Sequence, residues 1–160
     1  MEQWSDFFVA IAGAAAALTG LVFVGLSISL ARILNVPQLT GRASQSIQLL
    51  LVVLTVSALC LVPRQPIFLI GIEILSIGLV IWTVSLRLDL KMLGTVDAAF
   101  KRYSWLNMAF TQLSVLPYII SGIMLLCQGD VGIYWLIPGI IFSFIKAVLD
   151  AWVLLVEIHR

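Results

Sequence analysis

Five long runs of apolar residues dominate this sequence and constrain its fold more than any other feature. They cover residues 7–34, 46–62, 67–88, 103–127 and 133–157. A helix needs about 20 apolar residues to cross roughly 30 Å of hydrocarbon, and each run meets or approaches that length. The sequence therefore predicts an all-α integral membrane protein, a helical bundle with five transmembrane helices.

The composition supports this prediction. Apolar residues make up 62% of the chain and charged residues 11%, with a mean hydropathy of +1.15, whereas a soluble domain is about 25% charged. Strands are excluded because a lone strand leaves backbone groups unpaired in lipid. With a net charge of +1 and no basic block, nucleic acid is not an expected partner. We expect residues 1–160 to form one domain surrounded by the lipid bilayer.

The second run, 46–62, is the shortest, and it reaches a spanning length only when extended back through the segment ASQSIQ. A bundle of four helices is the alternative, but it would leave a very apolar segment outside the bilayer. We expect five crossings, with the segment PRQP (63–66) as a tight turn between the second and third.

Lysine and arginine residues are shared unequally between the two sides of such a bundle. With five crossings, one side carries Arg32, Arg42, Arg87, Lys91, Lys101, Arg102 and Arg160, and the other carries Arg64. Cytoplasmic connections are the ones enriched in these residues. We therefore expect the N-terminus outside and the C-terminus in the cytoplasm.

Two opposite charges interrupt the fifth run, where Lys146 and Asp150 stand four residues apart. Each costs about 2.5–3.5 kcal/mol at the centre of a transmembrane helix. A spacing of four puts both side chains on one helix face, where they can pair. We expect this face to turn away from lipid.

Polar residues extend that face into a stripe, and the fourth run carries a second stripe at the same three- and four-residue steps. The stripes are Gly139, Ser143, Lys146, Asp150 and Glu157, and Ser104, Asn107, Thr111, Ser114, Tyr118 and Ser121. We expect them to face each other or a hydrated cavity. They form a packing seam with an internal ion pair, a hydrated path or ligand site, or a docking surface for a partner protein.

Glu73 lies in the outer half of the third run and differs in depth from Lys146 by roughly 10 Å. It is either a structural group, protonated or bonded to a hydroxyl, or a ligand for an ion or proton. The candidate intramembrane site therefore comprises Glu73, Lys146, Asp150, Asn107, Thr111, Ser114, Tyr118 and Ser143.

Small residues share one face of the first run, namely Ala10, Gly13, Ala17 and Gly20. Such a face lets helix backbones approach closely. We expect it to pack within the protomer, and a contact between copies in a homo-oligomer is the alternative.

Cys60 and Cys127 fall near the outer ends of the second and fourth runs. They form a disulfide or, in the interpretation that we prefer, remain two buried thiols. The sequence shows no metal-ligand cluster, phosphate loop or nucleophile motif. We expect no metal, no cofactor and no catalytic residue, and a protein that is not an enzyme.

The segment WSDFFVAIAGAAAALTGLVFVGLSISLARIL, residues 4–34, resembles the opening of a group of small bacterial polytopic membrane proteins. Some members carry an automatic label as modulators of the FtsH protease. The resemblance implies a multi-pass protein of the bacterial plasma (inner) membrane and brings no site residues with it.

The expected function is that of an interaction or regulatory subunit, homo-oligomeric or bound to another membrane protein. The rival is a small ion channel or transporter that uses the two polar stripes together with Glu73, Lys146 and Asp150.

Overall fold

The computed structural model describes residues 4–28, 30, 33, 37–95 and 101–158, and every element within these ranges is helical. The long helices are α1 (Ser5–Ile28), α3 (Pro37–Cys60), α4 (Ile67–Thr95), α5 (Lys101–Gln128) and α6 (Leu136–Ile158), with the short 3₁₀ helix η3 (Gly129–Trp135) before α6. The predicted all-α class is confirmed.

Four segments of the described chain are long and apolar enough to cross a membrane. They are Ser5–Ile28, Leu39–Cys60, Ile67–Gly94 and Lys101–Val156, the last of which contains both α5 and α6. These lengths and compositions are those of a membrane helical bundle.

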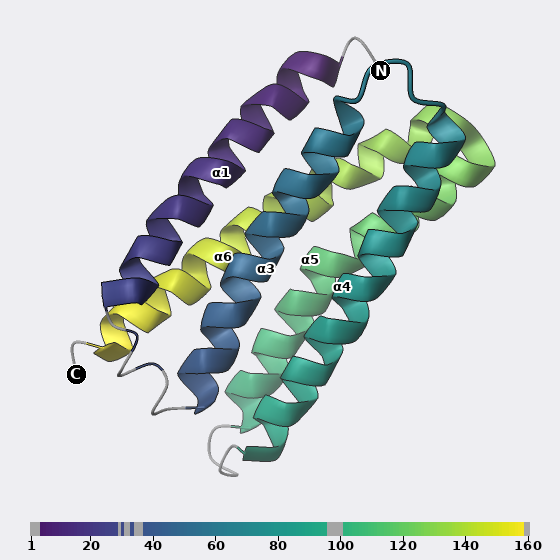
Figure 1. Cartoon of the computed structure of the whole chain (residues 1–160). Coiled ribbons are helices and arrows are strands. Elements are labelled where there is room, and N and C mark those ends of the chain that lie inside the picture. The colour runs from purple at the N-terminus through teal and green to yellow at the C-terminus, as the bar shows by residue number, and fades with distance from the viewer. Residues whose placement is uncertain (1–3, 29, 31–32, 34–36, 96–100, 159–160) are drawn as a thin grey trace.

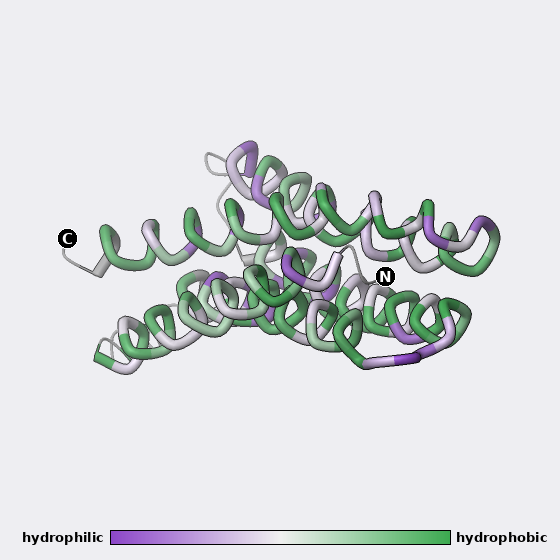
Figure 2. Tube along the Cα trace, turned by 90° about the horizontal axis from the view of Figure 1, so that it is seen from above, coloured by the Kyte–Doolittle hydropathy of each residue, from purple (hydrophilic) through white to green (hydrophobic). Residues whose placement is uncertain are grey.

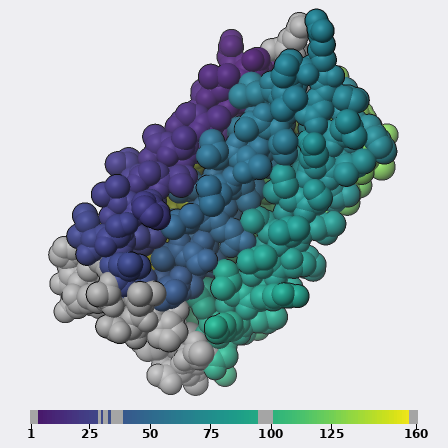
Figure 3. All heavy atoms as spheres, in the orientation of Figure 1, coloured from purple at the N-terminus to yellow at the C-terminus, as the bar shows by residue number. Residues whose placement is uncertain are grey.

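The long helices form two layers. α1, α3 and α4 lie side by side in front, and α5 and α6 lie behind them, with α6 crossing behind α3 at an angle (Figure 1; from above in Figure 2). The front layer makes up the face seen in Figure 3. α4 packs most extensively against α5, whereas α3 and α4 touch sparsely.

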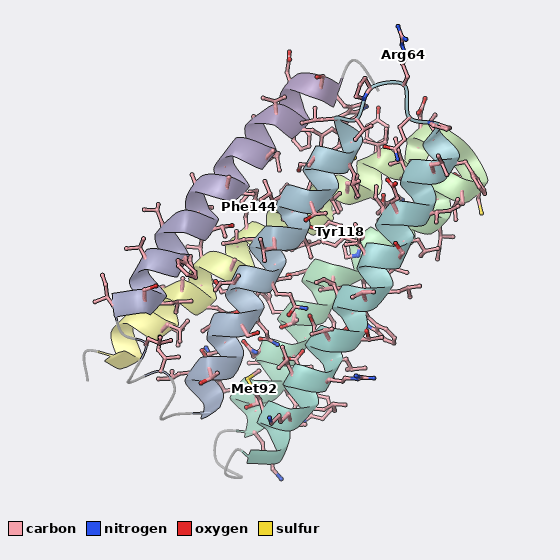
Figure 4. The ribbon with its side chains drawn as sticks, viewed as in Figure 1. Arg64, Met92, Tyr118 and Phe144 are labelled. Carbon is pink, nitrogen blue, oxygen red and sulfur yellow. The ribbon has the colours of Figure 1, made fainter. Side chains whose placement is uncertain are left out.

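Chain direction alternates from helix to helix, so the bundle has two distinct ends (Figure 1). The hairpin end holds the α3–α4 turn and η3. The opposite end holds the start of α3, the end of α4 and the start of α5. Arg64 and Met92 lie at these two ends, and the Arg64 side chain points away from the bundle (Figure 4).

The turn at residues 63–66 is as tight as the sequence predicts, since α3 ends at Cys60 and α4 begins at Ile67. Arg64 adopts a φ of 59° within it. This left-handed conformation is uncommon for a residue with a Cβ, and here it reverses the chain.

Glycine brings α4 and α5 close together. A Cβ added at Gly122 would lie 2.7 Å from the Cα of Leu75, and one added at Gly78 would lie 3.2 Å from the backbone nitrogen of Ile119. No larger residue fits at Gly122 without moving a backbone, so the extensive α4–α5 contact depends on it.

The interior changes in character along the bundle. Near the hairpin end the core is apolar and aromatic, and it includes Phe8, Val53, Ile74, Tyr118 and Ile140. The rings of Trp4 and Tyr134 meet edge to face at 5.2 Å and join α1 to η3. Toward the opposite end, charged and amide side chains enter the interior.

Two helices extend further than their apolar runs. α3 begins at Pro37 rather than Ser46, and α4 continues to Thr95 rather than ending at Leu88. The extra turns carry polar residues, which apolar content alone assigns to loops. Two of these polar residues, Gln45 and Asp89, point into the protein, where they are 1% and 3% exposed.

Candidate functional site

Lys146 and Asp150 form the centre of a buried polar site on α6. The Lys146 ammonium donates a hydrogen bond to Asp150 Oδ2, as the four-residue spacing predicts, and each residue is 2% exposed. Beside this pair, Ser46 Oγ donates to the carbonyl oxygen of Ala147 at 3.0 Å. This bond ties α3 to α6, so both charges face protein rather than lipid.

Arg42 adds a second cation from the first turns of α3. Its Nη1 lies 3.9 Å from Asp150 Oδ1, and its guanidinium lies 5.1 Å from the ring centre of Tyr103 on α5. Asp150 therefore serves two cations, one on each carboxylate oxygen. Arg42 also marks the edge of the site, because Tyr103 is exposed.

Asp89 is the second acid and comes from α4. Its Oδ1 accepts a hydrogen bond from Gln45 Nε2 at 2.6 Å. The side-chain amide of Gln112 on α5 also lies within hydrogen-bonding reach of this carboxylate. Gln112 Oε1 accepts a hydrogen bond from Trp82 Nε1 at 2.8 Å. Each of the four helices α3 to α6 thus contributes a side chain. We call Arg42, Gln45, Asp89, Gln112, Lys146 and Asp150 the charged cluster.

The formal charges of the charged cluster cancel. Arg42 and Lys146 carry two positive charges, and Asp89 and Asp150 carry two negative charges. Their fields act on one another across the interior. Charged groups are tolerated at membrane depth when they are paired in this way, and such groups are also the usual elements of ion and proton pathways.

The two predicted polar stripes face each other only in part. Tyr118 Oη and Ser143 Oγ share a hydrogen bond of 3.0 Å between α5 and α6, and Gly139 packs against the Tyr118 ring. Ser121 Oγ donates to the carbonyl of Gly132 at 2.8 Å. Nearer the opposite end, Lys146 and Asp150 turn toward α3 and α4 instead.

Two further stripe residues on α5 form their side-chain hydrogen bonds within their own helix. Thr111 and Ser114 are buried, and their hydroxyls donate to the carbonyls of Asn107 and Phe110, both at 3.0 Å. Ser104 and Asn107 are half-buried. The side chain of Glu157 lies outside the described part of the structure.

Glu73 stands apart from the charged cluster, near the hairpin end. It is half-buried, and its Oε2 accepts a hydrogen bond from Gln65 Nε2 at 2.7 Å. Its partner is thus an amide of the turn rather than a hydroxyl. The structure does not bring Glu73 to Lys146.

The expected packing of the small-residue face of α1 is wrong. Ala10, Gly13, Ala17 and Gly20 do not pack within the protomer, because all four are exposed on the side of α1 that faces away from α3. The apolar core takes Phe8 and Ala15 from α1, which lie on its other side.

The cysteines are both free thiols, so no disulfide joins them. Cys60 is buried as expected, but Cys127 is exposed.

Sequence reasoning missed four members of the charged cluster, Arg42, Gln45, Asp89 and Gln112. A signal for Asp89 was present, because Gly71, Ile74, Gly78, Ser85 and Asp89 follow helical spacing and all are buried. Among the described residues, no group of three or more His, Cys, Asp or Glu side chains is placed to hold a metal.

Comparison with protein-family models, with curated proteins and with solved structures finds no match to this chain. The site's geometry and the fold therefore carry the functional argument.

Proposed function

We propose that this chain is a non-enzymatic plasma-membrane protein that acts as an interaction or regulatory subunit. It crosses the bilayer five times and associates with a second copy of itself through its lipid-facing surface. In this proposal the N-terminus lies outside, the C-terminus lies in the cytoplasm, and the membrane is the inner membrane of a bacterium. Gln48 is the observation that carries the proposal of self-association.

Gln48 lies near the midpoint of α3, in an open groove between α3 and α4. The groove has a volume of about 500 Å³ and is lined by Ser44, Ile47, Gln48, Leu51, Val52, Thr55, Ile77, Ile81 and Val84. Within the described part of the chain, the Gln48 amide makes no hydrogen bond. An amide at this depth needs a partner, and glutamine supplies such bonds between transmembrane helices.

A second copy fits this requirement. A glutamine amide carries both donors and an acceptor, so two copies related by a two-fold axis can satisfy each other. The exposed small-residue face of α1 is a further surface of the kind that packs between helices, since nothing lies within 4 Å of a Cβ added at Gly13 or Gly20.

The test is the oligomeric state of purified protein in lipid nanodiscs or mild detergent. We expect Gln48→Leu to lower the fraction of dimer, whereas Thr55→Val should preserve it. Thr55 lines the same groove, but its hydroxyl already bonds the carbonyl of Leu51 at 2.7 Å. A wild-type protein that remains monomeric at high concentration in lipid would contradict the proposal.

The orientation has a native reporter in Cys127, which is exposed, whereas Cys60 is buried. If the hairpin end faces outward, a membrane-impermeant maleimide labels Cys127 in intact cells, and Cys127→Ser removes the label. Labelling that requires permeabilised cells would reverse the orientation without affecting the dimer proposal.

A second candidate function is ion or proton transport, and the charged cluster favours it because four helices bring two acids and two bases together in the interior. Proteoliposomes test this function directly. If Lys146→Met leaves assembly intact and abolishes an ion or proton flux, the cluster transports. If wild-type liposomes show no flux and the variant only loses stability, the cluster is structural.

A further inference from the structure

The two ends of the bundle carry exposed charges of opposite sign. At the hairpin end, Asp6 of α1 and Asp130 of η3 are exposed acids, and Arg64 is the exposed cation in the part of the chain that the structure describes. The opposite end exposes four cations, two on the last turns of α4 and two at the start of α5. We call these residues, Arg87, Lys91, Lys101 and Arg102, the basic end.

The protein does not neutralise the basic end. Within the described ranges, both ion pairs are made by Asp150, and its partners are Lys146 and Arg42. Asp89 is buried and accepts a hydrogen bond from Gln45. Asp97 is the other acid in residues 87–102, so this segment keeps an excess of positive charge. The exposed cations therefore draw their counter-charge from outside the chain.

The packing of α4 against α5 brings these cations to similar depths. The close contacts at Gly78 and Gly122 set the register of the two antiparallel helices. Continued to the end of α4, this register places Lys91 about 6 Å along the helix axis from Arg102. Arg87 lies one turn deeper, at a depth from which a long side chain can extend its charge toward the membrane surface.

Exposed aromatic residues place the basic end at the membrane surface. Tyr103, Trp105 and Trp152 are 54%, 57% and 61% exposed at this end, and Trp135 is 41% exposed at the hairpin end. Trp135 and Trp152 bracket α6 and lie roughly 25 Å apart along it, close to the thickness of the hydrocarbon layer. Exposed Trp and Tyr side chains favour the headgroup level on either side of that layer.

We propose that the basic end binds the headgroups of anionic phospholipids in the leaflet that surrounds it. Ammonium and guanidinium groups donate to phosphate oxygens, and a headgroup with a net negative charge supplies the missing counter-charge. A zwitterionic headgroup carries its own cation and gains less. This binding depends neither on self-association nor on which compartment the basic end faces.

The experiment measures which lipids the purified protein retains from mixed micelles that contain equal amounts of phosphatidylglycerol and phosphatidylcholine with the same acyl chains. Native mass spectrometry counts the bound molecules of each. We expect at least about a fivefold preference for phosphatidylglycerol at low salt, and a smaller preference at about 0.5 M salt. Equal retention of the two lipids by the wild-type chain would overturn the proposal.

The matched variants locate the preference. Lys91→Gln, Lys101→Gln and Arg102→Gln together should remove most of it, and all three side chains are exposed, so the fold should be kept. Arg64→Gln at the hairpin end is the control and should leave the preference unchanged. An unchanged preference in the triple variant, or an equal loss in Arg64→Gln, would overturn the proposal. The dimer fraction is measured separately, so self-association and lipid binding can fail independently.

Discussion

The two halves of the bundle interior are stabilised in different ways. Near the hairpin end, apolar and aromatic side chains fill the space between helices, with Tyr118 among the fully buried residues. Toward the opposite end, three equally buried side chains, those of Lys146, Asp150 and Asp89, are held by ion pairs and by hydrogen bonds from side-chain amides. Similar burial thus hides two different sources of stability.

The two halves should therefore differ in how much stability they lose when a residue is substituted. An apolar core loses stability in proportion to the volume or contact removed. A buried charged cluster behaves as a unit, because removing one charge leaves its partner unpaired in a region of low dielectric constant. We therefore expect the largest effects of single substitutions in the charged cluster.

The largest effect is expected for Asp150→Asn. This change leaves the Lys146 and Arg42 cations without their shared carboxylate, and breaking a buried pair costs about 3–5 kcal/mol. The measurement is the free energy of unfolding in mixed micelles. Glu73→Gln is the matched control near the hairpin end, because Glu73 is half-buried, and it should cost much less.

A second substitution should restore part of the stability that Asp150→Asn removes. Removing both charges with Lys146→Met and Asp150→Asn leaves Arg42 and Asp89, whose charges again cancel. The double variant should therefore be more stable than Asp150→Asn alone. A double variant that is less stable than either single variant would mean that the charged cluster does not act through charge balance.

An intermediate effect is expected for Gly122→Ala in the α4–α5 contact. The new methyl group would lie 2.7 Å from the Cα of Leu75, and forcing such a helix contact apart costs about 1–3 kcal/mol. Gly13→Ala is the control on α1, where nothing lies within 4 Å. Equal stability of the two variants would show that the α4–α5 contact is looser than the structure has it.

The smallest effect is expected for Tyr118→Phe, which removes one hydrogen bond between α5 and α6. Losing the bond to Ser143 should cost about 0.5–1 kcal/mol. Ser143→Ala should cost a similar amount, and the double variant should lose little more than either one. A loss as large as that of Asp150→Asn would place Tyr118 functionally within the charged cluster.

The sequence predicts the local part of the site but not the part that depends on helix packing. The Lys146–Asp150 contact follows from a spacing of four residues on one helix. Asp89 stands between Arg87 and Lys91, so its surroundings resemble a hydrated loop. The helical spacing that runs from Gly71 through Ser85 to Asp89 is the weaker signal.

Contacts between helices explain the other omissions. The Trp82–Gln112 and Gln45–Asp89 bonds join residues 30 and 44 positions apart, and nothing in the spacing of a single chain selects such pairs. The exposed face of α1 was misassigned for a related reason. Small residues predict that a helix can pack closely, but they do not identify the helix that packs there.

The alternating direction of the long helices has a consequence for attachment. α1 begins at the hairpin end, where the Trp4 ring meets Tyr134 of η3, and α6 ends at the opposite end (Figure 1). If the chain crosses the bilayer five times, as we propose, the start of α1 and the end of α6 lie on opposite sides of the membrane. A protein fused before α1 and a second protein fused after α6 would then be held on opposite faces of the membrane.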